Sequence, residues 1–156
     1  MKLSSGVCRV PEMLRLGVPV GLAVDGAASN DGSSLLEELR MCYLLHRLQA
    51  SAAAPTGYEV LKLATRGSAR LLGRDDIGVL APGKAADCFL IDLDRLSLVG
   101  AQFDPMSVLG TVGFQGSVDY TIVNGVPVVQ NGELTTMDEQ ETAQTANRVV
   151  RRYLNR

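Results

Sequence analysis

The stretch VPVGLAVDGAASN, residues 18–30, joins an almost wholly apolar run to a carboxylate and a small polar loop. Residues 18–24 show no alternation of apolar and polar side chains, a pattern typical of a strand buried on both faces of a parallel sheet. The run stops at Asp25. Barrels of the (β/α)8 type place their active sites at the C-terminal ends of such strands, so Asp25 is a candidate metal ligand or general base. An Asp after a strand is also a common turn former or helix cap, and spacing alone leaves both interpretations open.

Helical patterns follow and precede this stretch. The predicted helices cover residues 10–17, 35–50 and 57–72. Two of them begin with a capping box, in which Ser or Thr lies three residues before Glu: Ser34 with Glu37, and Thr56 with Glu59. An α/β arrangement is therefore expected for residues 1–73, the first of three predicted parts of the chain.

The remaining sequence has a different pattern, which predicts short strands joined by tight turns. Strands are predicted over residues 87–93, 118–123 and 126–130, and Asn124-Gly125 joins the last two as a hairpin turn. These strands make residues 74–135 the second part. Residues 136–156 form the third part, a terminal helix for which Thr136 and Glu139 are the expected capping box.

Composition narrows the possible partners. The formal net charge is −2, which argues against nucleic acid or an anionic membrane as the main partner. The longest apolar run, residues 16–24, is far shorter than the roughly 20 residues that span a bilayer. Three separated cysteines, Cys8, Cys42 and Cys88, favour a reducing compartment over a disulfide framework. A cytoplasmic protein is expected.

Four segments, in the same order along the chain, resemble signatures of one family. They are residues 17–30, ATRGSARLLG at 64–73, IGVLAPGKAAD at 77–87 and VNGVPV at 123–128. Together they are similar to the amidohydrolase superfamily, in its branch of aromatic deaminases. Residues 2–8 resemble that branch's loop after the seventh barrel strand, and residues 17–30 its eighth-strand motif. This resemblance implies the C-terminal portion of a metal-dependent-hydrolase (β/α)8 TIM barrel, followed by antiparallel strands of the accessory β-sandwich.

The resemblance also implies a reaction and its residues. Asp25 would bind or adjoin one divalent metal, zinc or alternatively iron, and take a proton from the metal-bound water. The water would attack a ring carbon that carries an amino group, and ammonia would leave. The DGAASN pattern favours 8-oxoguanine or guanine as the substrate, with cytosine or triazine rings next. Ser29 and Asn30 are candidate substrate-binding residues, with loop capping or support of Asp25 as alternatives.

One departure from the family limits this interpretation. The family's other metal ligands are histidines, whereas His46, the single histidine here, lies on the apolar stripe of a predicted helix and is interpreted as a core residue. A catalytic zinc normally takes three protein ligands, and a complete barrel takes about 250 residues. We therefore expect this sequence to begin near the seventh barrel strand of the complete enzyme. We also expect that the chain by itself does not retain the metal. The alternative function is a non-catalytic assembly module. Exposed strand edges favour a homo-oligomer.

Overall fold

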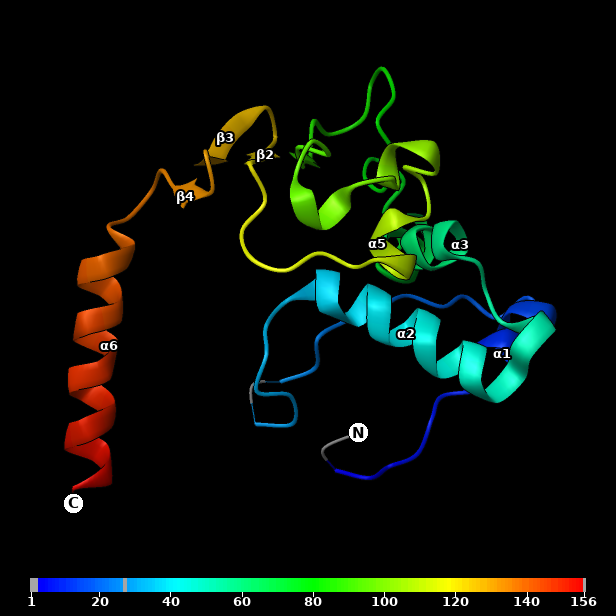
Figure 1. Cartoon of the computed structure of the whole chain (residues 1–156), viewed down its shortest axis with the longest axis horizontal. Coiled ribbons are helices and arrows are strands. Elements are labelled where there is room, and N and C mark those ends of the chain that lie inside the picture. The colour runs from blue at the N-terminus through cyan, green and yellow to red at the C-terminus, as the bar shows by residue number, and fades with distance from the viewer. Residues whose placement is uncertain (1–2, 27, 156) are drawn as a thin grey trace. The chain divides into compact units, whose positions relative to one another are not determined.

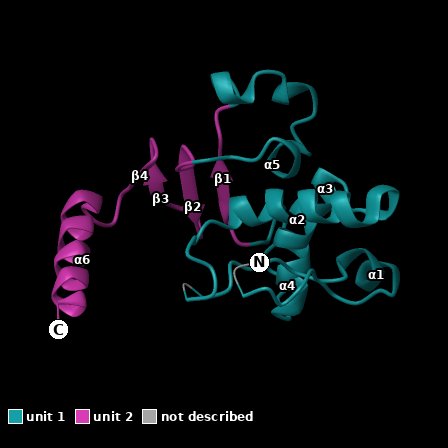
Figure 2. Ribbon diagram, turned by 60° about the horizontal axis from the view of Figure 1, so that its bottom comes forward, with its two compact units in different colours: residues 1–84, 93–115 teal, residues 85–92, 116–156 magenta. Residues whose placement is uncertain are grey.

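The computed structural model describes residues 3–26 and 28–155, which fall into two compact units (Figure 2). The first unit comprises residues 1–84 and 93–115, and the second comprises residues 85–92 and 116–156. Three positions used in the sequence predictions lie outside the described residues: Lys2, Ala27 and Arg156. The functional division into parts 1–73, 74–135 and 136–156 stays a prediction.

Helices build the first unit (Figure 1). They are α1 (Val10–Arg15), α2 (Leu35–Ala50), η1 (Ser51–Ala53), α3 (Gly57–Lys62), the π-helical η2 (Leu63–Gly67), α4 (Ser68–Leu71), η3 (Leu96–Leu98), η4 (Ala101–Phe103) and α5 (Val108–Thr111). The three helices predicted in this part are present, and the third continues from α3 through η2 to α4. Gly73 follows with a φ of +65°, the left-handed conformation in which many helices end.

Local capping explains where two of these helices begin. The Ser34 hydroxyl accepts a hydrogen bond from the Glu37 amide at 3.4 Å. At Thr56 the capping box is complete, since its hydroxyl accepts from the Glu59 amide and its own amide donates to the Glu59 carboxylate at 2.8 Å. The hydrogen bond from the Thr56 backbone N–H holds the pKa of the Glu59 carboxyl below its usual value.

The core of the first unit lies where α2, α3 and α5 meet. Leu39 on α2 and Val60 on α3 are its largest fully buried side chains. Glycines bring α3 and α5 close together, because a Cβ on Gly110 would lie 2.8 Å from the Gly57 Cα. A smaller cluster joins α1 to the apolar run through Val10, Val20 and Leu63.

The strand predicted over residues 18–24 is the main local difference from the sequence analysis. This segment has no strand assignment, and in the described part of the first unit no strand lies beside it. A strand depends on ladder hydrogen bonds to a neighbour, so an apolar run without a neighbouring strand cannot form one. The run packs instead against the helical segment η2–α4, where the Ser68 hydroxyl donates to the Leu22 carbonyl at 3.4 Å.

The second unit contains a four-stranded antiparallel sheet in the order β1-β2-β3-β4. The strands are β1 (Cys88–Leu90), β2 (Tyr120–Val123), β3 (Val126–Gln130) and β4 (Glu133–Leu134). Asn124 and Gly125 have φ values of 49° and 79°, the conformation that a type I′ hairpin turn requires. The predicted hairpin between β2 and β3 is confirmed.

The terminal helix α6 (Glu139–Leu154) begins with a different cap from the predicted one. Asp138 is its N-cap and accepts a hydrogen bond from the Glu141 amide at 2.9 Å. Glu139 instead accepts from the Leu134 amide at 2.9 Å, so the expected pairing of Thr136 with Glu139 is wrong. Thr136 with Glu139 and Asp138 with Glu141 have the same spacing, so either pair could begin the helix. Asp is at least as good an N-cap as Thr.

Among the described residues, no helix is both long and apolar enough to cross a membrane.

Candidate active site around Asp25

Asp25 follows the apolar run and is exposed, with a φ of +62°. This left-handed conformation is uncommon for residues other than glycine, although Asp and Asn tolerate it better than most. Backbone outliers of this kind cluster at active sites, where the surrounding structure holds them in place. Asp25 is therefore accessible, and its backbone conformation is one that Asp, Asn and Gly adopt more readily than other residues.

A tight turn follows Asp25. The backbone amides of Ser29 and Asn30 both donate to the Gly26 carbonyl, at 2.9 and 2.8 Å. Ser29 and Asn30 are both half-buried in this loop. The turn thus brings the predicted site residues Asp25, Ser29 and Asn30 into one loop.

The Asn30 side chain ties this loop to its surroundings. Its Nδ2 donates to the Val24 carbonyl at 3.0 Å and to Glu38 Oε1 at 2.6 Å. Its Oδ1 accepts from the Gly32 amide at 3.2 Å. Both amide hydrogens of Asn30 are therefore used within the chain. Direct substrate binding by Ser29 and Asn30 stays a prediction, as does the catalytic role of Asp25.

The helical segment behind the apolar run fixes where the run can lie. A Cβ on Gly67 would overlap the Val20 carbonyl oxygen, and a Cβ on Gly21 would lie 2.8 Å from the Ser68 hydroxyl. Glycine at both positions allows the two backbones to approach this closely. The segment that precedes Asp25 is thereby held against η2 and α4.

A metal site requires several ligand side chains close together. Within the part of the chain that the structure describes, no group of three His, Cys, Asp or Glu side chains could hold a metal ion. His46 is buried at 4% exposure, its Nδ1 lying 2.6 Å from the Cys42 carbonyl and its Nε2 lying 3.0 Å from the Cys8 carbonyl. The prediction of a core histidine is confirmed. Asp25 supplies one carboxylate, and the described residues alone do not fit a catalytic zinc ion, which needs further ligands.

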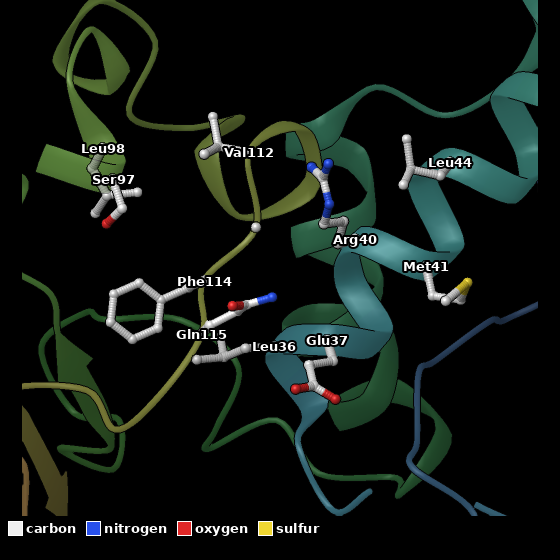
Figure 3. A pocket seen from close by; sticks show the side chains of 11 residues that line it. Leu36, Glu37, Arg40, Met41, Leu44, Ser97, Leu98, Val112, Phe114 and Gln115 are labelled. Atoms are coloured by element: carbon white, nitrogen blue, oxygen red, sulfur yellow. The ribbon is translucent and has the colours of Figure 1, made fainter.

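A cavity of about 650 Å³ lies elsewhere in the first unit. Figure 3 shows its walls, which come from α2 and from the segments around Leu98 and Phe114. Arg40 is at its edge and donates to the Thr111 carbonyl. None of the residues at the predicted site lines this cavity, so the cavity does not support the proposed catalytic role of Asp25.

The sequence analysis missed the residues that support the site. Glu38 was one acidic residue among several on a helix, and its partner Asn30 lies across a loop. Gly67 was recognised only as part of a motif. The spacing of apolar residues along a helix does not predict the contact of Glu38 with Asn30 or that of Gly67 with Val20. Both contacts depend on how separate segments pack.

Comparison with known proteins identifies relatives of this chain. Residues 1–128 match the profile of the amidohydrolase family. Hydroxydechloroatrazine ethylaminohydrolase from Pseudomonas sp. strain ADP is 47% identical over 151 residues, covering 95% of this chain and 31% of that protein. The 8-oxoguanine deaminase of Pseudomonas aeruginosa is 45% identical over 138 residues, covering 88% of this chain and 30% of that protein.

A solved structure shows the same likeness in three dimensions. The structure of an adenosine deaminase from Xanthomonas campestris with bound zinc has a TM-score of 0.89 and 30% identity, covering 99% of this chain and 36% of that one. The predicted α/β fold class, a portion of the amidohydrolase fold with antiparallel strands, is confirmed. The chain spans 30–36% of the length of these three relatives.

Proposed function

Because this chain belongs to the amidohydrolase family, we propose that it supplies the catalytic aspartate of an enzyme that removes an amino group from a heteroaromatic ring. The family is enzymatic, and the relatives named above are hydrolases acting on C–N bonds. The observation that carries the proposal is the position of Asp25. Its carboxylate is exposed at the end of the apolar run, in a left-handed conformation that the following loop supports.

In the proposed reaction Asp25 moves one proton. The carboxylate accepts a proton from the attacking water as the water oxygen bonds to the ring carbon. It then gives that proton to the amino nitrogen, the C–N bond breaks, and ammonia leaves a ring that carries oxygen in place of nitrogen. An exposed carboxylate suits this role, because substrate and water must both reach it.

A divalent metal is part of the proposal. Zinc is the favoured ion, since the Xanthomonas campestris adenosine deaminase structure contains it, with iron as the alternative. When bound, such an ion lowers the pKa of water and stabilises negative charge on oxygen. Asp25 is the residue of this chain proposed as a ligand.

The favoured substrate is an 8-oxoguanine-like or guanine-like ring. Support comes from the DGAASN sequence and from the 45% identity to 8-oxoguanine deaminase. A triazine is the next candidate because the ethylaminohydrolase is 47% identical, and cytosine follows. Ser29 is proposed to face the substrate. We further propose a cytoplasmic homo-oligomer whose partners do not include nucleic acid or membrane.

A chimera tests the function. This chain would replace the matching segment of the Pseudomonas aeruginosa 8-oxoguanine deaminase, and ammonia release would be measured with 8-oxoguanine, guanine, cytosine and a hydroxylated aminotriazine. We expect activity with the first ring, and a loss of at least 1,000-fold on Asp25→Asn. Glu37→Gln, the same change from a carboxylate to its amide at an exposed position nearby, is the control and should keep most of the activity. Full turnover by Asp25→Asn would refute the role of Asp25.

One observation favours a second function, a non-catalytic assembly module. The described residues contain no set of three metal ligands, so the chain by itself should neither bind stoichiometric zinc nor release ammonia. Metal analysis and an ammonia assay on the purified chain decide this point. Zinc at one ion per chain together with turnover would exclude the assembly module. An inactive chimera with an intact fold would favour it.

A further inference from the structure

We propose that Asn30 and Glu38 form a brace that holds Asp25 in its working orientation, with both as positioning residues. This inference rests on the proposed function of Asp25 and adds to it a device in which Glu38 acts from the neighbouring helix. No contact of Glu38 with substrate is needed. The argument depends on three hydrogen bonds around one amide group.

The Asn30 amide reaches the backbone on both sides of Asp25. Nδ2 binds the Val24 carbonyl, which belongs to the peptide unit immediately before Asp25, at 3.0 Å. Oδ1 binds the Gly32 amide at 3.2 Å, where the loop leaves the site. The Val24 bond fixes the orientation of the peptide unit on the N-terminal side of Asp25, from which its φ of +62° is measured.

The chemistry of the contacts permits only one orientation of the Asn30 amide. Nδ2 faces two oxygen acceptors, on Val24 and Glu38, while Oδ1 faces an N–H donor on Gly32. Exchanging the amide oxygen and nitrogen would place three acceptors together and two donors together. The network therefore specifies the side chain completely.

Glu38 anchors this network to the core. Its Oε1 accepts from Asn30 Nδ2 at 2.6 Å, a short bond of the charge-assisted kind. Glu38 lies in the first turns of α2, where the helix dipole favours a carboxylate. The next residue, Leu39, is only 2% exposed and belongs to the core of the first unit. The loop of Asp25 is thus hydrogen-bonded to a helix that packs in the core.

The amide of Asn30 has little capacity left for a substrate. Both Nδ2 hydrogens are used, and one lone pair on Oδ1 is used by Gly32. A substrate that took either hydrogen would have to break a bond of the brace. This separates Asn30 from Ser29, whose hydroxyl is the better candidate for a direct contact.

Hydrogen exchange on the chain itself tests the brace without any activity. Asn30→Asp replaces the donor by a carboxylate that faces Glu38, so the hydrogen-bonded amides of Ser29, residue 30 and Gly32 should exchange at least tenfold faster. Glu38→Gln keeps an acceptor and should change exchange less than threefold. In the double variant Asn30→Asp/Glu38→Gln, the new amide can donate to the new carboxylate, so part of the protection should return, while the bond to the Val24 carbonyl stays lost. Glu37→Gln, the same change one residue away, is the control.

The chimera described above supplies the second readout. Asn30→Asp should lower kcat at least tenfold with little change in KM, and the double variant should recover part of the kcat. A tenfold rise in KM with unchanged kcat would instead identify Asn30 as a substrate contact and overturn the proposal. Unchanged exchange in Asn30→Asp, or a double variant no better than Asn30→Asp, would overturn it as well. Activity retained in Asp25→Asn would refute the proposed function but leave the exchange result standing.

Discussion

At the scale of single residues, the backbone conformation of Asp25 limits which side chains this position tolerates, apart from any chemical role of the carboxylate. A φ of +62° is costly for most residues because Cβ approaches the backbone, by about 1–2 kcal/mol. Asp and Asn tolerate it, and Gly adopts it freely. The choice of residue at position 25 is therefore under both a chemical and a conformational constraint.

This constraint predicts how substitutions at position 25 separate stability from function. Asp25→Ala should lower the free energy of unfolding by about 1 kcal/mol, because Ala lacks the tolerance for a left-handed conformation. Asp25→Asn should change it by less than about 0.5 kcal/mol, and Asp25→Gly should also keep the fold. Urea unfolding of the three variants measures these differences. Equal stability of the Ala and Gly variants would contradict the conformational argument.

The sequence was sufficient to assign His46 to the core, because it lies on the apolar stripe of a helix. It made Asp25 a candidate whose role stays a prediction. It was not sufficient for the support of Asp25. The Asn30 side chain bonds to Glu38 eight residues away, across a loop whose path no periodicity determines. Such contacts follow from packing, so they become visible only once the loop and the helix are placed together.

Cys42 gives a second prediction at this scale. Burial raises the pKa of its thiol from 9.0 to about 11, with smaller contributions from Cys8 and Glu38. At pH 8 the thiol is therefore neutral and unreactive. A disulfide reagent should modify the exposed Cys8 quickly and Cys42 only on unfolding.

The same shift makes stability depend on pH. The unfolded chain loses the Cys42 proton near pH 9, while the folded chain keeps it until about pH 11. The contribution to stability is thus complete below pH 9 and is lost as the pH rises through this window. The urea midpoint should fall more steeply between pH 9 and 11 in the native chain than in Cys42→Ala. Identical slopes in the two proteins would show that Cys42 does not titrate in this way.

At the scale of elements, local signals succeeded and non-local ones failed. The N-cap at Ser34, the capping box at Thr56 and the turn at Asn124-Gly125 were predictable because all their contacts lie within four residues. Residues 18–24 read as a strand, yet their state depends on neighbours far along the sequence. What holds them here is the close approach of Gly67 to Val20.

Gly67→Ala tests that approach. The added Cβ would overlap the Val20 carbonyl oxygen, which belongs to the backbone and cannot rotate away. The clash should cost about 3 kcal/mol, offset by about 1 kcal/mol of better helix propensity, for a net loss of about 2 kcal/mol. Gly26→Ala, with open space around the new Cβ, is the matched control for urea unfolding. A Gly67→Ala chain as stable as the control would show that the run and the helix are not in tight contact.

At the scale of the whole molecule, the chain leaves much apolar surface exposed. Helix α6 has no buried residue, and its C-terminal turns expose Val150, Tyr153 and Leu154 at 52%, 73% and 74%. Apolar side chains exposed together in this way favour association with other chains.

A homo-oligomer at micromolar concentration is therefore the expected state of this chain, and size-exclusion chromatography with light scattering measures it directly. Replacing Val150 and Tyr153 by Lys removes apolar surface from α6 and leaves the buried residues of both units unchanged, so the molar mass should fall towards that of one chain. Replacing the exposed Gln140 and Gln144 by Lys adds the same charge to α6 without removing apolar surface, and that control should still associate. A native chain that stays monomeric at micromolar concentration would show that its exposed apolar side chains do not drive self-association.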